Sequence, residues 1–245
     1  MEIEIALYMI PVPISDGNLD RVLPAENKGI VMSLRHFIVE NVRTARRFLK
    51  KLAPAIDIAE INFYELNGHT DENEISTYLE PLRKGSPMGI MSEAGCPGVA
   101  DPGAQAVAIA QQEGRKVIPL VGPSSILMSL MASGLNGQKF AFQGYLPVKD
   151  PERDKVVKSL ESESRRNDMT QIFIETPYRN EKMMECLMKN LGNDTLVCVA
   201  SDISNPQGEK IVTKTVKEWK TERIKLEKVP TIFLLYSPAS TGRKR

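Results

Sequence analysis

The stretch MGIMSEAGCPGVADPG, residues 88–103, decides the fold. Its first four residues suit a buried strand, and the rest is a loop with three glycines, two prolines and the acids Glu93 and Asp101. Glycine lets a backbone turn tightly and approach a ligand, and proline stiffens it. Asp101 suits the cap of a following helix, with Pro102 in the first turn. Because ligands bind beyond the carboxyl ends of strands in open α/β sheets, we expect Glu93 to contact a ligand; the alternative is an acid held by turn amides.

The composition is that of a globular protein with nearly balanced charge. Of 245 residues, 42% are hydrophobic, and 32 Lys and Arg face 31 Asp and Glu, which gives a net charge of +1. The length suffices for one large domain or two α/β lobes. The balance argues against a protein wrapped in nucleic acid, although it leaves room for a local basic patch.

Cysteine, histidine and apolar patterns exclude several classes of protein. The three cysteines and two histidines have no metal-ligand spacing, so we expect no metal site and no structural disulfide. No apolar run approaches the ~18 residues that span a bilayer. The N-terminal MEIEIALYMI has acids where a signal peptide has basic residues. We therefore expect a cytoplasmic protein that does not associate with membranes.

Strand-like and helix-like segments alternate in the first half, which indicates βαβ units and a mainly parallel sheet with helices on both faces. The second half has strand-like segments closer together, which indicates hairpins and a mixed sheet. The sequence therefore predicts an α/β protein of two lobes, residues 1–120 and 121–245. Predicted strands are 3–10, 29–34, 61–66, 88–92, 116–120, 140–146, 170–175, 195–201, 209–215 and 231–236, and predicted helices are 42–52, 71–83, 104–114, 121–134, 151–163, 179–190 and 215–222.

Several motifs together resemble one family. SEAGCPGVADPG (92–103) resembles the S-D-A-G-T-P-G-I-S-D-P-G signature of ribosomal RNA small subunit methyltransferase I, in the tetrapyrrole (corrin/porphyrin) methylase superfamily. LVGPSSILMSLMASGL (120–135), FAFQGYLP (140–147) and FIETPYR (173–179) resemble its later motifs in the same order. VENVRTARRFL (39–49) is similar to its E-D-T-R-H-T-R-x-L-L. The similarity runs from Leu7 to Ser237.

This resemblance implies a function and a set of site residues. It implies a homodimer of two-lobed chains that binds S-adenosylmethionine in the cleft between the lobes and methylates a ribose 2′-hydroxyl of ribosomal RNA in the small subunit. Carried over motif by motif, the cofactor-binding residues are Pro13, Ser92, Glu93, Ala94, Gly95, Cys96, Pro97, Pro123, Ser124, Ser125, Glu175, Thr176, Pro177, Pro230 and Thr231.

Because the sequence departs from the family motifs at several positions, the motifs do not determine the identity of the methyl acceptor. The signature Asp is Glu93, and its Thr is Cys96. Asn41 and Thr44 replace an Asp and a His, and Ser201-Asp202 replaces an Arg-Glu pair. Two alternatives follow: a methyltransferase for a small tetrapyrrole or corrin, and a non-catalytic paralogue that binds S-adenosylmethionine.

Methyl transfer to a hydroxyl benefits from a proton acceptor. Candidates are Glu40, Glu65, Glu93 and Glu175, and we assign catalytic roles to Glu93 and to Arg43, which matches the family's Arg. Arg43 also belongs to a basic helix that either contacts RNA phosphates or is simply a solvated face. The basic residues of this helix are Arg43, Arg46, Arg47, Lys50 and Lys51.

Overall fold

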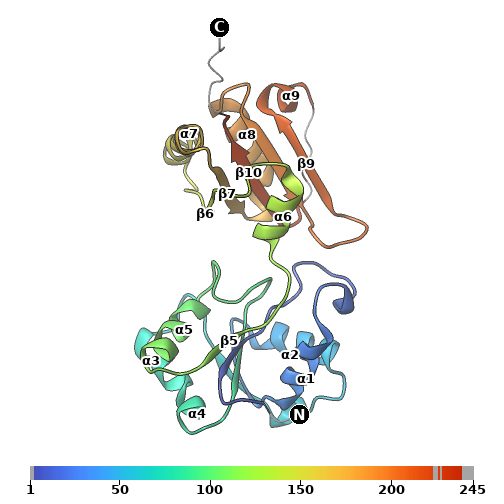
Figure 1. Ribbon diagram of the computed structural model, residues 1–245, viewed down its shortest axis with the longest axis vertical. Coiled ribbons are helices and arrows are strands. Elements are labelled where there is room, and N and C mark those ends of the chain that lie inside the picture. Colours follow the sequence, from blue (N-terminus) through green and yellow to red (C-terminus); the bar gives the residue numbers. More distant parts are fainter. Residues whose placement is uncertain (1–2, 223–225, 227, 239–245) are drawn as a thin grey trace. The chain divides into compact units, whose positions relative to one another are not determined.

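The computed structural model describes residues 3–222, 226 and 228–238, and the chain divides into two compact units, Met1–Ser124 and Ser125–Arg245 (Figure 1). Each unit contains one five-stranded sheet with helices packed against it. We call them unit 1 and unit 2. The predicted α/β fold class is confirmed.

The sheet of unit 1 is parallel throughout. Its strand order is β3-β2-β4-β1-β5, so β4 lies at the centre between β1 and β2. All four residues of β4 are buried, as expected for a central parallel strand covered on both faces. The strands are β1 (Leu7–Met9), β2 (His36–Val39), β3 (Asn62–Glu65), β4 (Met88–Met91) and β5 (Val117–Pro119).

Helices cover both faces of this sheet. Alternate residues of β2 enter different cores: Phe37 packs with Ala45 and Leu49 of α2, whereas Ile38 packs in the core that contains Ala106 of α5. This alternation is the period of two that a strand imposes on its side chains. The helices are η1 (Leu19–Arg21), α1 (Ala25–Ser33), α2 (Val42–Leu52), η2 (Ile58–Glu60), α3 (Glu72–Tyr78), α4 (Glu80–Arg83) and α5 (Gly103–Gln112).

Unit 2 contains a mixed sheet with the order β6-β7-β10-β8-β9. β6 and β7 are parallel, and the other neighbours are antiparallel, including the β8–β9 hairpin. Side chains of α7, α8 and α9 share one core with Phe173 and Phe233. The elements are α6 (Ser125–Ser133), β6 (Phe140–Tyr145), α7 (Asp150–Asn167), β7 (Thr170–Glu175), η3 (Pro177–Arg179), α8 (Asn180–Asn190), β8 (Leu196–Ser201), β9 (Lys210–Thr215), α9 (Val216–Thr221) and β10 (Thr231–Tyr236).

One predicted strand is wrong. Residues 29–34 were expected to form a strand, but 29–33 are the second half of α1, and Leu34 ends that helix. Asn27, Ile30, Val31 and Leu34 are buried, and their spacing is that of a helix face and not the alternation of a strand. The strand at this point of the sheet is instead β2, His36–Val39, which sequence reasoning missed.

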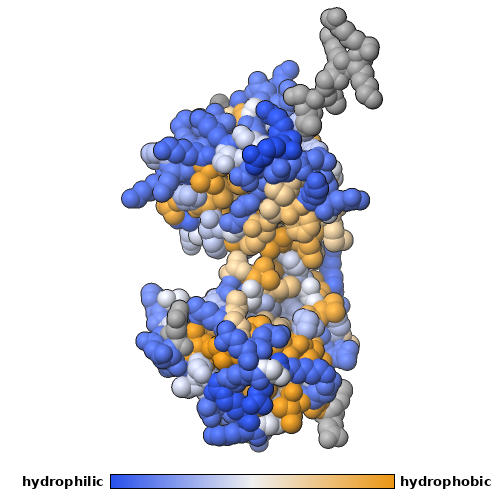
Figure 2. All heavy atoms as spheres, turned by 60° about the vertical axis from the view of Figure 1, so that its left-hand side comes forward, coloured by the Kyte–Doolittle hydropathy of each residue, from blue (hydrophilic) through white to orange (hydrophobic). Residues whose placement is uncertain are grey.

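The surface of each unit mixes hydrophilic and apolar residues. Figure 2 shows apolar side chains between hydrophilic areas on the visible face of each unit. Among the helices of the described residues, none combines the length and the apolar character needed to cross a bilayer. Exposed apolar side chains of unit 2 include Leu127, Met131, Phe140, Tyr145 and Tyr178.

Candidate functional site

The loops after β1 and β4 are joined at the carboxyl edge of the parallel sheet. The N–H of Val12 donates to the Gly95 carbonyl over 2.9 Å, and the N–H of Gly95 donates back to the Val12 carbonyl over 3.1 Å. This antiparallel bridge lies outside the regular strands. We call residues 92–103 the strand-end loop. Its position is therefore fixed by a neighbouring loop as well as by β4.

The loop after β5 packs against these two loops. The thiol of Cys96 donates to the Pro123 carbonyl at 3.4 Å, and burial raises the pKa of this thiol. A Cβ added to Gly122 would lie 2.3 Å from the Cβ of Pro11, so the loops after β1 and β5 approach too closely for any side chain at residue 122. Cys96 thus acts as a neutral hydrogen-bond donor and not as a thiolate nucleophile.

Backbone conformation accounts for two glycines of the strand-end loop. Gly95 and Gly98 have φ values of +73° and +81°, in the left-handed region that side chains disfavour. A Cβ at Gly95 would also press against Ile14 at 3.3 Å. The Asp101 carboxylate closes the loop, because its Oδ1 accepts the N–H groups of Gly98 at 2.8 Å and Gly103 at 2.7 Å. Asp101 therefore stabilises the entry to α5 from one residue before the observed cap, Pro102, and not from the cap position itself as the sequence predicts.

Glu93 is an exposed residue of the strand-end loop, and two hydrogen bonds fix its position. Its Oε1 accepts the Thr44 hydroxyl at 2.5 Å, and its N–H donates to Oε1 of Glu40 at 3.1 Å. Thr44 belongs to the first turn of α2, and Asn41 caps that helix by accepting the N–H groups of Arg43 and Thr44. Glu40 follows β2, so loops after two adjacent strands converge on Glu93.

Glu40 and Asp101 form an acidic pair next to Glu93. Burial raises the pKa of Glu40 to about 7, and hydrogen bonding and charge repulsion from Asp101 act in the same direction. The N–H of Glu93 opposes the shift. Oδ2 of Asp101 is buried and receives no donor among the described residues apart from a proton on Glu40. Glu40 therefore titrates close to neutral pH and is partly protonated there.

Apart from Ser125, which begins α6, the predicted site residues of unit 2 lie where β7 ends and the adjacent β10 begins. Thr231 pairs with Glu175 across the two strands. Oε1 of Glu175 accepts the N–H of Thr176 at 2.6 Å and the guanidinium of Arg179 at 2.6 and 2.8 Å, and its side chain is 1% exposed. The hydroxyl of Thr231 accepts from the Asn180 amide at 3.0 Å. Glu175 is thus engaged in an ion pair and poorly placed to accept a proton from a substrate.

The predicted residues fall into two groups, one in each unit. Arg43 is exposed at the start of α2, beside Thr44. Sequence reasoning missed the pairing of Glu40 with Asp101 and the contact of Thr44 with Glu93. Unit 1 contains Pro13, Ser92, Glu93, Ala94, Gly95, Cys96, Pro97, Pro123 and Ser124. Unit 2 contains Ser125, Glu175, Thr176, Pro177, Pro230 and Thr231.

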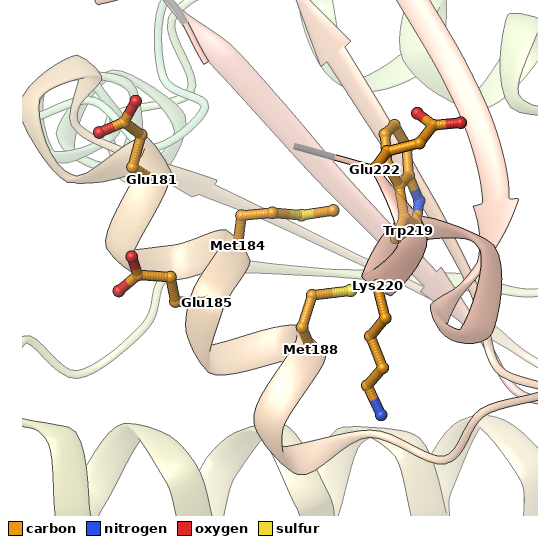
Figure 3. Close-up of a pocket in the computed structure, with 7 residues that line it drawn as sticks. All are labelled: Glu181, Met184, Glu185, Met188, Trp219, Lys220 and Glu222. Atoms are coloured by element: carbon orange, nitrogen blue, oxygen red, sulfur yellow. The ribbon is translucent and has the colours of Figure 1, made fainter. Parts of the chain in front are cut away.

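A groove of about 410 Å³ in unit 2 is separate from these residues. Figure 3 shows Met184 and Met188 of α8 facing Trp219 of α9 across it. Glu222 on its rim forms an ion pair with Lys214. The groove is lined by none of the predicted site residues, and it is a packing seam between two helices.

Comparison with known proteins gives sequence relatives named ribosomal RNA small subunit methyltransferase I. The chain is 30% identical over 198 residues to ribosomal RNA small subunit methyltransferase I of Vibrio cholerae, a match that covers 81% of this chain and 65% of that protein. It is 29% identical over 212 residues to the protein of the same name from Bacillus subtilis, with 86% and 68% covered. The chain thus spans about two thirds of the length of these curated relatives. No family model matches.

Solved structures share the fold. The methyltransferase CobJ matches with a TM-score of 0.61 and 14% identity over 95% of this chain and 94% of that one. The cobalt precorrin-4 methyltransferase CbiF, a cobalamin biosynthetic enzyme, matches with a TM-score of 0.56 and 16% identity over 95% of each chain. These likenesses concern the fold alone. The chain is thus a sequence relative of ribosomal RNA small subunit methyltransferase I and shares its fold with these two methyltransferases.

Proposed function

We propose that this protein is an S-adenosylmethionine-dependent methyltransferase that methylates a ribose 2′-hydroxyl of small-subunit ribosomal RNA. The observation that carries the proposal is the strand-end loop, which resembles the family signature and is tied to the loops after β1, β2 and β5. Support also comes from the relatives, whose names specify ribosomal RNA of the small subunit.

The strand-end loop suits a methyl donor that must keep its methyl group accessible. S-adenosylmethionine supplies, when bound, an electrophilic methyl group on a sulfonium. Ala94 is exposed and small, so the loop places little side-chain bulk against a ligand at this point. The bridge to Val12 fixes the loop in advance, which lowers the entropy lost on binding. Residues 92–97, with Pro13, Pro123 and Ser124, would hold the cofactor on unit 1.

The proton of the acceptor hydroxyl would pass to Glu93. Its carboxylate is exposed, and the Thr44 hydroxyl fixes one of its oxygens while the other remains available. As the acceptor oxygen takes the methyl carbon, whose bond to the sulfonium sulfur breaks to leave a neutral thioether, the hydroxyl proton would pass to this carboxylate. With a pKa of about 7, Glu40 is partly protonated at neutral pH, which lessens the negative charge beside Glu93. Arg43, one residue before Thr44, would hold a phosphate of the same RNA.

Residues of unit 2 would complete the cofactor site. Ser125, Glu175, Thr176, Pro177, Pro230 and Thr231 are proposed on the resemblance to the family. Glu175 serves as a rigid support, because its carboxylate is already held by Arg179 and by the Thr176 amide. The cleft between the lobes, the homodimer and the cytoplasmic location stay predictions. Light scattering on the purified chain would measure its assembly state directly.

A tracer assay tests the proposed activity. Labelled S-adenosylmethionine is offered with small ribosomal subunits, with free ribosomal RNA or with a precorrin, and calorimetry measures uptake of the cofactor and of its demethylated product. We expect cofactor binding and label on RNA. Label on the precorrin would show a small-molecule methyltransferase instead. Binding without transfer to any acceptor would show a non-catalytic paralogue, and no binding would refute the proposal at its root.

A further inference from the structure

Helix α2 presents an exposed face with five positive charges. Its sequence, VRTARRFLKKL, contains no acid. The opposite face is buried, with Ala45, Leu49 and Leu52 in the core of unit 1. The helix is therefore oriented by its apolar side, and the cations point to solvent. We call Arg43, Arg46, Arg47, Lys50 and Lys51 the cationic face; all five are exposed.

The cationic face has no counter-charges. Among the residues that the structure describes, no ion pair involves any of the five. Lys50 donates to the carbonyls of Pro54 and Ile56, and Arg46 lies over the ring of Phe63 at 5.3 Å. Within the described part of the chain, the side chains of Arg43, Arg47 and Lys51 have no such partner. The charge of these three is free for an external anion.

The spacing of the cations disfavours the helix itself. Arg43, Arg47 and Lys51 follow one another at intervals of four, so like charges stack along one line of the surface, which destabilises a helix. Arg43 also lies in the first turn, where the helix dipole favours an acid. A chain with a net charge of only +1 concentrates its cations here at a cost in stability. Helix formation does not explain this pattern, whereas anion binding does.

The cationic face begins beside the proposed proton acceptor. Thr44, in the first turn of α2, holds Glu93 by a hydrogen bond of 2.5 Å. Arg43 precedes Thr44 directly, so a phosphate on Arg43 would lie close to Glu93. Eleven residues of α-helix extend about 16 Å from this point, enough to follow several nucleotides of a strand.

A groove extends the cationic face at the far end of α2. It has a volume of about 490 Å³, and Lys51 and Lys28 line it together with the apolar side chains of Leu19 and Leu23. Asp20 also lines it. Apolar walls beside lysines suit an unstacked base next to its phosphate, which is how single-stranded RNA is commonly held.

We propose that the cationic face of α2 binds the phosphate backbone of the RNA substrate and leads the strand to Glu93. This inference rests on the proposed function, since the RNA is the substrate of that site. RNA is favoured over an acidic protein as the partner. The three unpaired cations are evenly spaced, face solvent and have no exposed apolar side chain between them. Phosphate recognition needs only such charges, whereas protein interfaces usually include apolar contacts.

Binding is measured without a methyl donor, so that it is independent of catalysis. The probe is a fluorescein-labelled, unstructured RNA of twenty nucleotides, followed by anisotropy over a range of salt concentrations. The test variant carries Arg43→Gln, Arg47→Gln and Lys51→Gln. The control carries Lys155→Gln, Lys158→Gln and Arg166→Gln, which remove the same charge from exposed positions of α7.

The test variant should bind RNA at least about tenfold more weakly. The slope of log affinity against log salt concentration should also fall in magnitude by about 2, if each of the three residues neutralises one phosphate. The control should change affinity less than about twofold. The test variant should unfold at the same or a higher temperature, because like-charge repulsion is removed. This stability readout separates loss of a binding surface from loss of the fold.

Three results would overturn the inference: unchanged RNA affinity in the test variant, equal weakening in the control, or equal competition by polyglutamate and by unlabelled RNA. A chain that shows the expected RNA binding but transfers no methyl group would refute only the proposed activity. A test variant that methylates RNA with unchanged KM would refute only the role of α2.

Discussion

The N–H of Glu93 donates to the carboxyl group of Glu40 over 3.1 Å, and this bond joins the loop after β4 to the loop after β2. The same Glu40 is close to Asp101, whose other oxygen closes the strand-end loop. Glu40 thus links the exposed Glu93 to the buried support of the loop. Its titration should be visible in the stability of the whole protein.

Glu40→Gln should remove the loss of folding stability that the wild type shows as pH rises. The pKa of Glu40 is raised from 4.5 to about 7, so the folded protein keeps a proton that the unfolded chain has released. The stabilising contribution of this proton is complete below pH 4.5 and is lost as pH rises through 7. A Gln side chain can accept the N–H of Glu93 and donate to Asp101 as protonated Glu40 does, and it does not titrate. The variant should therefore gain in melting temperature over the wild type at pH 8 and not at pH 5.

The exposed Glu26 of α1 provides a matched control for that experiment. Glu26→Gln should leave the difference in melting temperature the same at both pH values. An equally constant difference for Glu40→Gln would show that Glu40 does not hold the proton.

Glu93→Gln should slow methyl transfer by about 10²- to 10⁴-fold, because the amide cannot accept the hydroxyl proton. Thr44→Val should have a smaller effect, since it removes only the hydroxyl that orients Glu93. Single-turnover transfer of labelled methyl and calorimetry of cofactor binding measure the two steps separately. Full turnover and full cofactor affinity in Glu93→Gln would exclude Glu93 as either a base or a cofactor contact.

Gly122→Ala should destabilise unit 1. The added Cβ would lie 2.3 Å from the Cβ of Pro11 and 2.6 Å from its Cγ, so two loops must separate. Overpacking of this kind costs about 1–3 kcal/mol. At Gly68 nothing lies within 4 Å of an added Cβ, so Gly68→Ala should stay within about 0.5 kcal/mol of the wild type. Urea denaturation measures both; equal midpoints for the two variants would contradict the close approach.

Thr215→Ala should destabilise unit 2 by about 1 kcal/mol. Thr215 caps α9 by accepting the N–H of Glu218 at 3.2 Å, and the Glu218 carboxylate accepts the N–H of Thr215 at 2.8 Å. The helix holds Trp219 in the core, so fraying would expose an aromatic side chain. Thr215→Ser keeps the hydroxyl and should retain most of the stability. Tryptophan fluorescence during urea unfolding follows both variants.

Much of the fold could be predicted from the sequence because local residue patterns indicate most of the helices and strands. The alternation of apolar strands with amphipathic helices gave the parallel sheet, and the closely spaced strands of the second half gave the mixed one. The failure at 29–34 has a local cause: Ile30 and Val31 are adjacent and apolar, as in a strand, and only their burial together with Asn27 and Leu34 reveals the helical period. β2 was missed because four residues give too short a pattern.

The site was only partly predictable, for a different reason. The strand-end loop is a local feature, since glycines and prolines determine its shape. The contacts of Glu93 with Glu40 and Thr44 join residues about 50 positions apart, which no local pattern encodes. One signal was present: had His36–Val39 been recognised as a parallel strand, Glu40 would have stood at its carboxyl end, beside the residue that follows β4.

The reciprocal bonds between Val12 and Gly95 also have a dynamic consequence. Neither amide can become exposed to solvent unless the bridge opens, so both belong to one cooperative opening event. In deuterated water the two amide protons should exchange with the same protection, although 83 positions of chain separate them. Ala94 and Pro13, each next to one end of that bridge, would then change position together when it opens.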